Sequence, residues 1–211
     1  PDQGQTIIPL MPPATTYGGE SAILDISDSQ IAVGYASIGL DQDAIDFIED
    51  TTGGCADPDL NMPIEICIQN IASGIYHLEA FKWNLDVNGE VSSEGLGYLV
   101  NPHVDDTREN VSRAQAVNNH GVAVGYAWGW VDETETQPSE NESRQFYAVV
   151  FKDGEVTSFT KEHDVYFDAR AYDINNAGIA TGHVTMAING KWRTKFYYID
   201  TTNVDEMELV L

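Results

Sequence analysis

Positively charged residues are scarce in this chain. Its 211 residues include 10 Lys and Arg against 34 Asp and Glu, which gives a net charge of −24 at pH 7. A surface this acidic repels phosphate backbones, so the composition argues against nucleic-acid binding. Two interpretations stay open: a solvated, salt-adapted surface, or binding of Ca²⁺ through carboxylate and carbonyl oxygens. Because no Asp-x-Asx-x-Asx-Gly loop with a closing Glu is present, we expect no cofactor or metal and keep calcium as the alternative.

Long apolar runs are also missing, and no signal peptide is recognisable at Pro1. No stretch is long enough to cross a bilayer as a helix, so we expect no membrane span. The chain begins without Met, which indicates a processed form or a piece of a longer protein. With 42% apolar residues at this length, a single domain over residues 1–211 is expected.

Cysteine is limited to Cys55 and Cys67, twelve positions apart. Two cysteines with no histidine nearby are too few for a zinc site. The spacing favours a disulfide, worth about 3 kcal/mol by loop entropy, and with it an extracellular or periplasmic location. The alternative is two free thiols in a reducing cytosol.

Motifs of known catalytic sites are absent. The five histidines form no His-Glu-x-x-His pattern and no pair four residues apart. A nucleophile elbow, a phosphate loop and a dinucleotide fingerprint are missing as well. We therefore favour a protein without enzymatic activity.

What the chain does contain is one thirteen-residue phrase repeated three times. The copies run from Ile23 to Tyr35, from Ala114 to Tyr126 and from Ala171 to His183. Each consists of two alternating runs separated by a polar cluster such as Asn-Asn-Ala-Gly, the pattern of a tight β-hairpin. The first copy has Gln30 where the others have Gly, so we expect its hairpin to be wider.

The second run of each phrase has one face of large residues and one face of small residues. Side chains alternate across a strand, so alanine and glycine gather on the small face and let another backbone approach closely. We expect the large-residue face of one repeat to pack on the small-residue face of the next, head to tail. The large-face residues that end the copies are the candidate binding residues: Tyr35, Tyr126 and His183.

Each phrase is followed by an aromatic strand and a further turn, which makes the unit a four-stranded antiparallel meander. The expected units cover about residues 21–100, 112–160 and 169–200. Their repetition predicts an all-β, partial β-propeller-like fold, with a β-sandwich as the alternative. Insertions fall between the second and third strands; the first contains residues 41–50, a candidate short helix, and both cysteines, and the second contains several acidic residues. Such insertions often form the binding face of a repeat protein, although tolerated surface loops would show the same pattern.

Asp25 and Asp173 occupy equivalent positions in the first strands of the first and third copies. If they converge, a carboxylate pair could serve a glycan-active hydrolase. The competing interpretation, which we favour, is that each aspartate caps its own turn.

A stack of three units leaves one large-residue face and one small-residue face uncovered. We expect the first at the repeat ending in Tyr35 and the second at the repeat ending in His183. Three candidates could cover these faces: the proline-rich residues 1–20, the C-terminal residues or a second copy of the chain. The third candidate would make the chain self-associate through its end units.

The phrases AVNNHGVAVGYA and AYDINNAGIATGH, each followed by an aromatic strand, resemble the HAF-type extracellular repeats of bacteria. Over about residues 21–200 the chain is most similar to an uncharacterised family of secreted or periplasmic gammaproteobacterial proteins. The resemblance implies secretion and carries no assigned chemistry. Sequence alone thus predicts a secreted or periplasmic repeat module that binds an unknown ligand or protein partner through its strand-two to strand-three loops.

Overall fold

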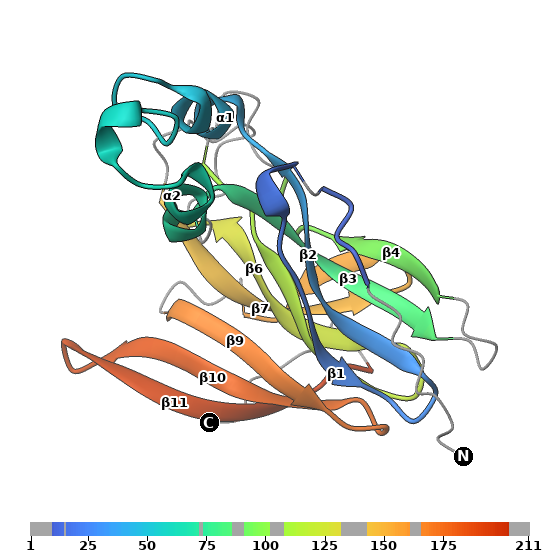
Figure 1. The fold of residues 1–211 in the computed structure, drawn as a ribbon. Helices are drawn as coiled ribbons and strands as arrows, with labels where there is room; N and C mark the ends of the chain where they lie inside the picture. The colour runs from blue at the N-terminus through green and yellow to red at the C-terminus, as the bar shows by residue number, and fades with distance from the viewer. Residues whose placement is uncertain are drawn as a thin grey trace, which may run out of the picture.

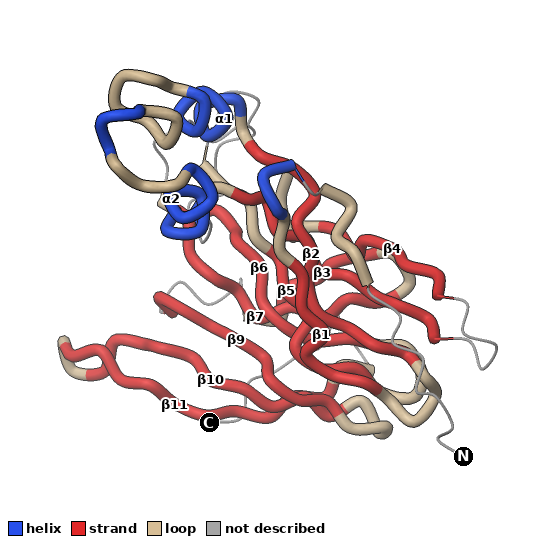
Figure 2. The backbone as a smooth tube through the Cα atoms, in the orientation of Figure 1, coloured by secondary structure: helices blue, strands red, loops and turns tan. Residues whose placement is uncertain are grey.

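Three antiparallel sheets make up most of the chain (Figure 1). The computed structural model describes residues 10–14, 16–71, 74–85, 91–101, 108–131, 143–160 and 166–202. Within them the all-β prediction and the repeated meander are confirmed, and the third sheet has three strands. The helical segments gather at one end of the molecule, away from the repeated hairpins (Figure 2). Sheet 1 contains β1 (Ser21–Ile26), β2 (Ile31–Leu40), β3 (Tyr76–Leu85) and β4 (Val91–Gly97); sheet 2 contains β5 (Ser112–Val117), β6 (Ala123–Trp130), β7 (Arg144–Lys152) and β8 (Glu155–Ser158); sheet 3 contains β9 (Tyr166–Ile174), β10 (Ile179–Ile188) and β11 (Lys191–Asp200).

The hairpin at the start of each sheet has the same turn in all three copies. In the second copy the Asn118 N–H donates to Val122 O at 3.0 Å, and in the first the Ser27 N–H donates to Ile31 O at 2.9 Å. Gln30 adopts a left-handed φ of 64°, close to the 79° of Gly121. The expectation of a wider first hairpin is therefore wrong, because a non-glycine residue takes the left-handed position at a local energetic cost.

A β-bulge explains the glycine that the three phrases share. The first strand of each hairpin carries one extra residue opposite its partner, and the register shifts there. The carbonyl group of the bulged strand then lies against the glycine: a Cβ atom on Gly34 would lie 1.8 Å from Ala22 O, and one on Gly125 would lie 1.9 Å from Arg113 O. The small residue thus admits a backbone, as expected, but this backbone belongs to the same hairpin.

Successive sheets pack as the alternation predicts, large face on small face. Val33 of sheet 1 lies against Ala114 and Ala123 of sheet 2. Val124 of sheet 2 lies against Ala171 and Ala180 of sheet 3. All of these side chains are buried, so the two interfaces form the main core of the molecule.

The two free faces are opposite to the expected ones. The large-residue face of sheet 1 is covered by sheet 2, and the uncovered large-residue face belongs to sheet 3, where Phe196 is 80% exposed and Tyr198 is 55% exposed. The small-residue face is the outer side of sheet 1. Alternation distinguishes the two faces of a strand without giving the direction in which sheets stack, and this is why the assignment from sequence failed.

The described part of the proline-rich segment covers the outer side of sheet 1. Leu10 packs on the cluster of Ala32 and Trp83. The Ala14 N–H donates to Ser37 O at 3.0 Å, and the Ser37 hydroxyl donates to Ala14 O at 2.8 Å. This segment therefore covers one end of the stack, as expected, and the 3-10 turn η1 (Thr16–Gly18) follows it. Residues 1–9 and the C-terminal residues 203–211, the other candidate cover, lie outside the described residues.

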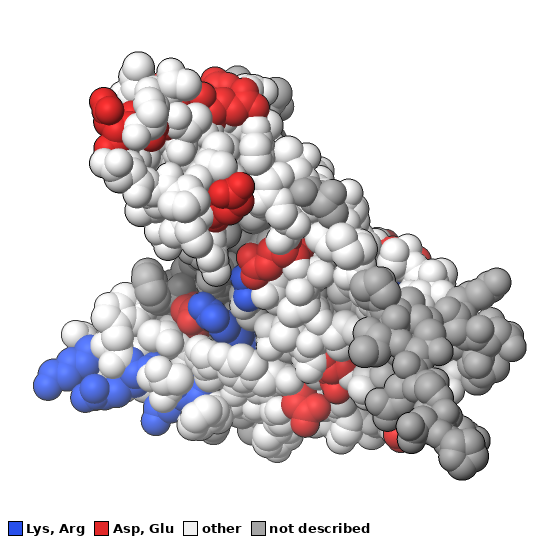
Figure 3. Space-filling view, in the orientation of Figure 1, with Lys and Arg blue, Asp and Glu red and all other residues white. Residues whose placement is uncertain are grey.

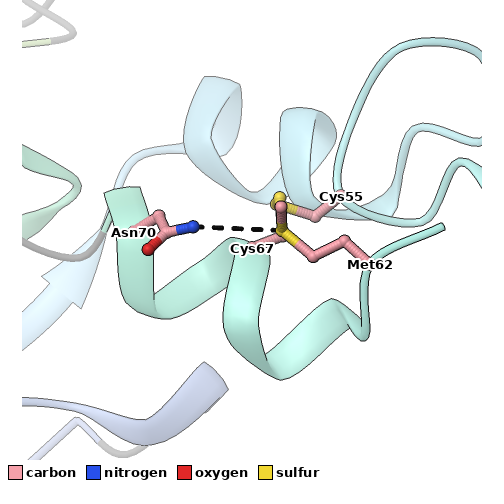
Figure 4. The surroundings of a disulfide bond; sticks show 4 residues. All are labelled: Cys55, Met62, Cys67 and Asn70. Carbon is pink, nitrogen blue, oxygen red and sulfur yellow. Dashed lines mark hydrogen bonds between the residues drawn. A yellow bond between two sulfur atoms is a disulfide. The ribbon is translucent and has the colours of Figure 1, made fainter. Parts of the chain in front are cut away.

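The first insertion forms a small helical lobe between β2 and β3. It contains α1 (Gln42–Glu49), which confirms the expected short helix, the 3-10 turn η2 (Pro58–Leu60) and α2 (Ile64–Ile71). The disulfide between Cys55 and Cys67, also expected, ties the loop after α1 to α2, with Met62 and Asn70 beside it (Figure 4). Ile48 and Ile68 pack with the cystine to form the interior of the lobe. The acidic part of the second insertion, residues 132–142, lies outside the described residues.

In the parts of the chain that the structure describes, no helix is long and apolar enough to cross a membrane.

We expect Gly34→Ala to lower the free energy of unfolding by about 1–3 kcal/mol, because its Cβ would overlap the Ala22 carbonyl oxygen. Gly39→Ala, in the same strand, is the matched control, since its Cβ would meet no atom closer than 3.9 Å. Urea denaturation of both variants measures the difference. Equal stability of the two would contradict the role of the bulge.

Replacing both cysteines by serine should loosen the helical lobe and leave the sheets folded. The lobe has a small core around the cystine, so loss of about 3 kcal/mol of loop constraint is large for it. Amide exchange at Ile48 and Ile68 should accelerate, while exchange at Val124 in sheet 2 should not change. Uniform acceleration across all three sheets would show that the lobe is not an independent unit.

Candidate functional site

The three candidate binding residues take the same place in their sheets. Tyr35, Tyr126 and His183 lie in the second strands, and their partners in the first strands are Ala22, Arg113 and Arg170 in turn. The repeat in the sequence thus becomes a repeat in space along the stack.

Each tyrosine is covered by an arginine from the next sheet. The Arg113 guanidinium lies 4.0 Å from the centre of the Tyr35 ring, and that of Arg170 lies 4.7 Å from the centre of the Tyr126 ring. A cation over an aromatic face is attracted by the ring quadrupole, by about 0.5–2 kcal/mol depending on desolvation. These contacts join sheet 1 to sheet 2 and sheet 2 to sheet 3.

Further rings and guanidinium groups extend these contacts into one cluster. Trp128 stacks on Phe146 with ring centres 3.8 Å apart, and Phe146 meets Tyr126 edge-on at 4.9 Å. Arg144 lies over Trp128 at 5.2 Å, and Arg108 lies over Trp130 at 5.6 Å. We call the whole set the arginine–aromatic cluster: Tyr35, Arg108, Arg113, Tyr126, Trp128, Trp130, Arg144, Phe146 and Arg170.

The cluster lies at the root of both insertions. Leu40 and Ile75, where the helical lobe leaves and rejoins sheet 1, belong to the same apolar group as Tyr35 and Trp128. The second insertion begins just after Trp130 and ends just before Arg144, two members of the cluster. The strand ends from which both connections leave, in sheets 1 and 2, therefore lie close together.

Arginine is concentrated here in an acidic molecule. Every arginine of the chain except Arg193 belongs to the cluster. The described contacts bring two carboxylates to it: Glu20, which accepts from the Tyr35 hydroxyl at 2.7 Å, and Asp168, which lies 3.2 Å from Arg170 Nε. Figure 3 shows basic side chains in the hollow between the helical lobe and sheet 3, with acidic side chains beside them.

Burial shifts the pKa of two phenols in this region, Tyr35 and Tyr172. It raises the pKa of Tyr35, and the hydrogen bond to Glu20 raises that pKa further, while Arg113 acts in the opposite direction. Burial also raises the pKa of Tyr172 in sheet 3. At neutral pH both phenols are therefore neutral hydrogen-bond donors.

Two donors of the cluster are buried without an acceptor among the residues that the structure describes. They are Arg113 Nε and Trp128 Nε1. A buried donor with no acceptor is costly, by about 1–3 kcal/mol. Both atoms can only donate, so a ligand that satisfied them would have to present oxygen or another acceptor.

His183 differs from the two tyrosines in its surroundings. Its Nε2 lies 3.5 Å from Asp168 Oδ2, and its ring centre lies 5.4 Å from that of Tyr172. Within the described residues no arginine covers it.

The two aspartates proposed as a catalytic pair lie in sheets 1 and 3, with sheet 2 packed between these sheets. Asp25 Oδ2 accepts from the Val117 N–H of sheet 2 at 2.9 Å, and Asp173 Oδ1 accepts from the Ile174 N–H at 2.9 Å. Asp25 thus bonds across the sheet interface, a role different from the expected cap on its own turn. Asp173 does bond its own strand. Hydrolase activity stays a prediction.

No group of three or more His, Cys, Asp or Glu side chains arranged as metal ligands occurs in the described ranges. Calcium binding, suggested only by the acidic composition, likewise stays a prediction.

The arginines are the part of the site that was missed from the sequence. A signal for them does exist: Arg113-Ala114 and Arg170-Ala171 stand at the start of the second and third phrases, and the first phrase has Ala22-Ile23 there. Extending each repeat by one residue toward the N-terminus includes Arg113 and Arg170, whereas nothing in the repeats points to Arg108 and Arg144.

A comparison with protein families gives a match over residues 2–210 to a family described as "Protein of unknown function (DUF3466)". This agrees with the expected similarity to an uncharacterised family; HAF-type repeats and a gammaproteobacterial origin stay predictions. No match was found among curated proteins or among solved structures.

Asp25→Ala should lower the free energy of unfolding by about 1–3 kcal/mol, because the Val117 N–H in the interface would lose its acceptor. Asp25→Asn keeps an oxygen there and should cost less. Asp28→Ala, at an exposed position in the adjacent turn, is the control and should change stability by less than about 0.5 kcal/mol. Thermal unfolding followed by circular dichroism makes the comparison; no difference between Asp25→Ala and Asp28→Ala would remove the bridging role.

Proposed function

Because the chain belongs to the DUF3466 family of unknown function, its role must be argued from the site, and we propose that it is a non-enzymatic binding module for a carboxylate-bearing ligand such as an acidic polysaccharide. The ligand would lie on the arginine–aromatic cluster at the root of the two insertions. We further propose that the protein acts outside the cytoplasm, in the extracellular space or the periplasm; the disulfide supports an oxidising location.

The observation that carries the proposal is the pair of buried donors, Arg113 Nε and Trp128 Nε1, within the arginine-rich part of an acidic chain. A carboxylate accepts hydrogen bonds from guanidinium groups in a planar fork, which explains why arginine rather than lysine would be used. The stacked rings of Trp128 and Phe146, both partly exposed, add flat apolar surface of the kind that lines ligand sites.

The net charge of −24 opposes the approach of an anion from a distance. At physiological ionic strength the screening length is about 8 Å, so distant carboxylates contribute little at the cluster. The local guanidinium groups then dominate, and affinity should depend on contacts made at short range.

Binding can be tested by affinity electrophoresis and calorimetry with polygalacturonate, using neutral dextran as the comparison polymer. Wild-type protein should be retarded by polygalacturonate and not by dextran. Trp128→Phe keeps a ring and removes the Nε1 donor, so it should weaken binding about tenfold, equivalent to one hydrogen bond to a charged group. Arg113→Lys keeps the charge and removes the planar fork, so it should weaken binding as well.

Matched controls are available on the β10–β11 hairpin, outside the cluster. Trp192→Phe and Arg193→Lys make the same chemical changes there and should leave the affinity unchanged. Failure of the wild type to bind the acidic polymer, or equal losses in cluster and hairpin variants, would contradict the proposal.

A further inference from the structure

The outer face of sheet 3 repeats the large-residue side of two interfaces that are already occupied. Val33 in sheet 1 and Val124 in sheet 2 are fully buried under the alanines of the next sheet. Thr181 takes the corresponding place in sheet 3 and is exposed. We call this the outer face; the exposed residues that define it are Tyr172, Thr181, Phe196 and Tyr198, with His183 partly buried among them.

At the outer face of sheet 3, the ring that would receive an arginine is present and the arginine is absent from the described residues. Tyr35 and Tyr126 each receive an arginine from the first strand of the following sheet. His183 occupies the third such position, and the Asp168 carboxylate lies 3.5 Å from its Nε2. A cation delivered to this place would meet a carboxylate and two aromatic rings.

Hydrogen bonds also connect the turns of the three hairpins, from sheet 1 to sheet 2 and from sheet 2 to sheet 3. The Ser29 hydroxyl donates to Asn119 O at 2.7 Å, and the Asn119 N–H donates to Asn176 Oδ1 at 2.8 Å. The Asn118 side-chain amide donates to Asn175 O at 3.3 Å. Asn175 takes the place of Asn118 in sheet 3, and its Oδ1 accepts from Ala177 and Ile179. Its Nδ2 donates to no residue that the structure describes, so these hydrogen bonds can continue to one more turn.

Phe196 departs from the repeated pattern in size. It aligns with Ala80 of sheet 1 and Ala148 of sheet 2, which are fully buried. The Ala148 N–H donates to Thr160 Oγ1, in the segment that connects sheets 2 and 3. The Ala80 N–H donates to Ser112 Oγ, in the first residue of β5. In sheet 2 this position therefore meets the connecting segment, and in sheet 1 it meets the residue at which that segment enters β5.

We infer that the outer face of sheet 3 is the docking site of a fourth antiparallel sheet of the same repeat type. Its facing side is rich in alanine and glycine, and its first strand begins with an Arg-Ala pair. The arginine lies over His183 beside Asp168, and its hairpin turn accepts the Asn175 amide. An interface that forms twice in the same register is open a third time at the outer face.

A second copy of this chain does not meet these requirements. Among the described residues, the small-residue face that lies outside the two interfaces is the outer side of sheet 1, where Leu10 already packs on Ala32. Its first strand has Ala22 at the arginine position. Both the room for the large side chains and the cation are therefore missing there.

The inference can be tested by extending the full chain with a second copy of residues 166–202 placed after Leu211. The eleven residues 201–211 would then connect the end of β11 to the appended copy, against seven between Ser158 and Tyr166 in the native connection. The appended copy carries Tyr172→Leu, Phe196→Leu and Tyr198→Leu, so that the peptides with Tyr172 and Tyr198 of the original sheet can be distinguished by mass. Hydroxyl-radical footprinting should show modification of the original Tyr172 and Tyr198 falling at least about threefold, with a rise in Tm.

Two variants of the extended chain test the contacts. Arg170→Ala in the appended copy removes the predicted cation and should restore part of the modification. Thr181→Lys in the original sheet 3 places a charge on the outer face; it should abolish protection in the extended chain and leave the Tm of the normal chain unchanged, because Thr181 is exposed there. Glu155→Lys, an exposed change in sheet 2, is the control for added charge.

If Tyr172 and Tyr198 of the original sheet were modified as strongly in the extended chain as in the normal chain, the inference would be overturned. This holds whether the appended copy folds without docking or stays unfolded, because docking is expected to bury the small-residue face of the appended copy. Sedimentation of the normal chain gives the other decisive result. A dimer that protects the outer face and is lost on Thr181→Lys would identify a second copy as the occupant and overturn it as well.

Discussion

The packing of large side chains on a face of alanine and glycine sets the geometry of the whole molecule. Sheets can approach closely only because Ala123 and Ala180 leave room for Val33 and Val124. The glycine in each hairpin serves a related purpose inside the sheet, where it admits the carbonyl of a bulged strand. The β-bulge, the glycine and the small-residue face therefore act together: the bulge shapes the first strand of each hairpin, and the flat small-residue face packs against the neighbouring sheet.

Contacts at the edges of the sheets add direction to this packing. Asp25 accepts a backbone hydrogen bond from sheet 2, the turn asparagines bond from sheet to sheet, and each arginine covers a tyrosine of the sheet before it. Apolar packing alone is non-directional, whereas hydrogen bonds and cation–ring contacts fix how one sheet is placed on the next. The same register recurs at both interfaces for this reason.

The arginines connect the architecture to the proposed binding role. Arg113 and Arg170 hold neighbouring sheets together, and with Arg108 and Arg144 they also concentrate positive charge where the two insertions begin. The insertions can vary in length because loop closure costs little extra entropy per added residue. A rigid cluster at the root of variable loops is an arrangement in which the scaffold supplies the charge and the loops supply selectivity.

Local chemistry in the sequence determined the strands, the turns, the alternation of large and small residues, the short helix at residues 42–49 and the Cys55–Cys67 pair, because each depends on neighbours close in the chain. It also placed Tyr35, Tyr126 and His183 at equivalent positions. Only the tertiary structure decided which face each sheet turns to its neighbour, that Gln30 adopts a glycine-like conformation, and that Asp25 bonds to Val117 rather than to its own turn. The tertiary structure also decided that Arg113 and Trp128 lie in one cluster. Alternation is symmetric with respect to stacking direction, and contacts between residues far apart in the chain exist only once that direction is chosen.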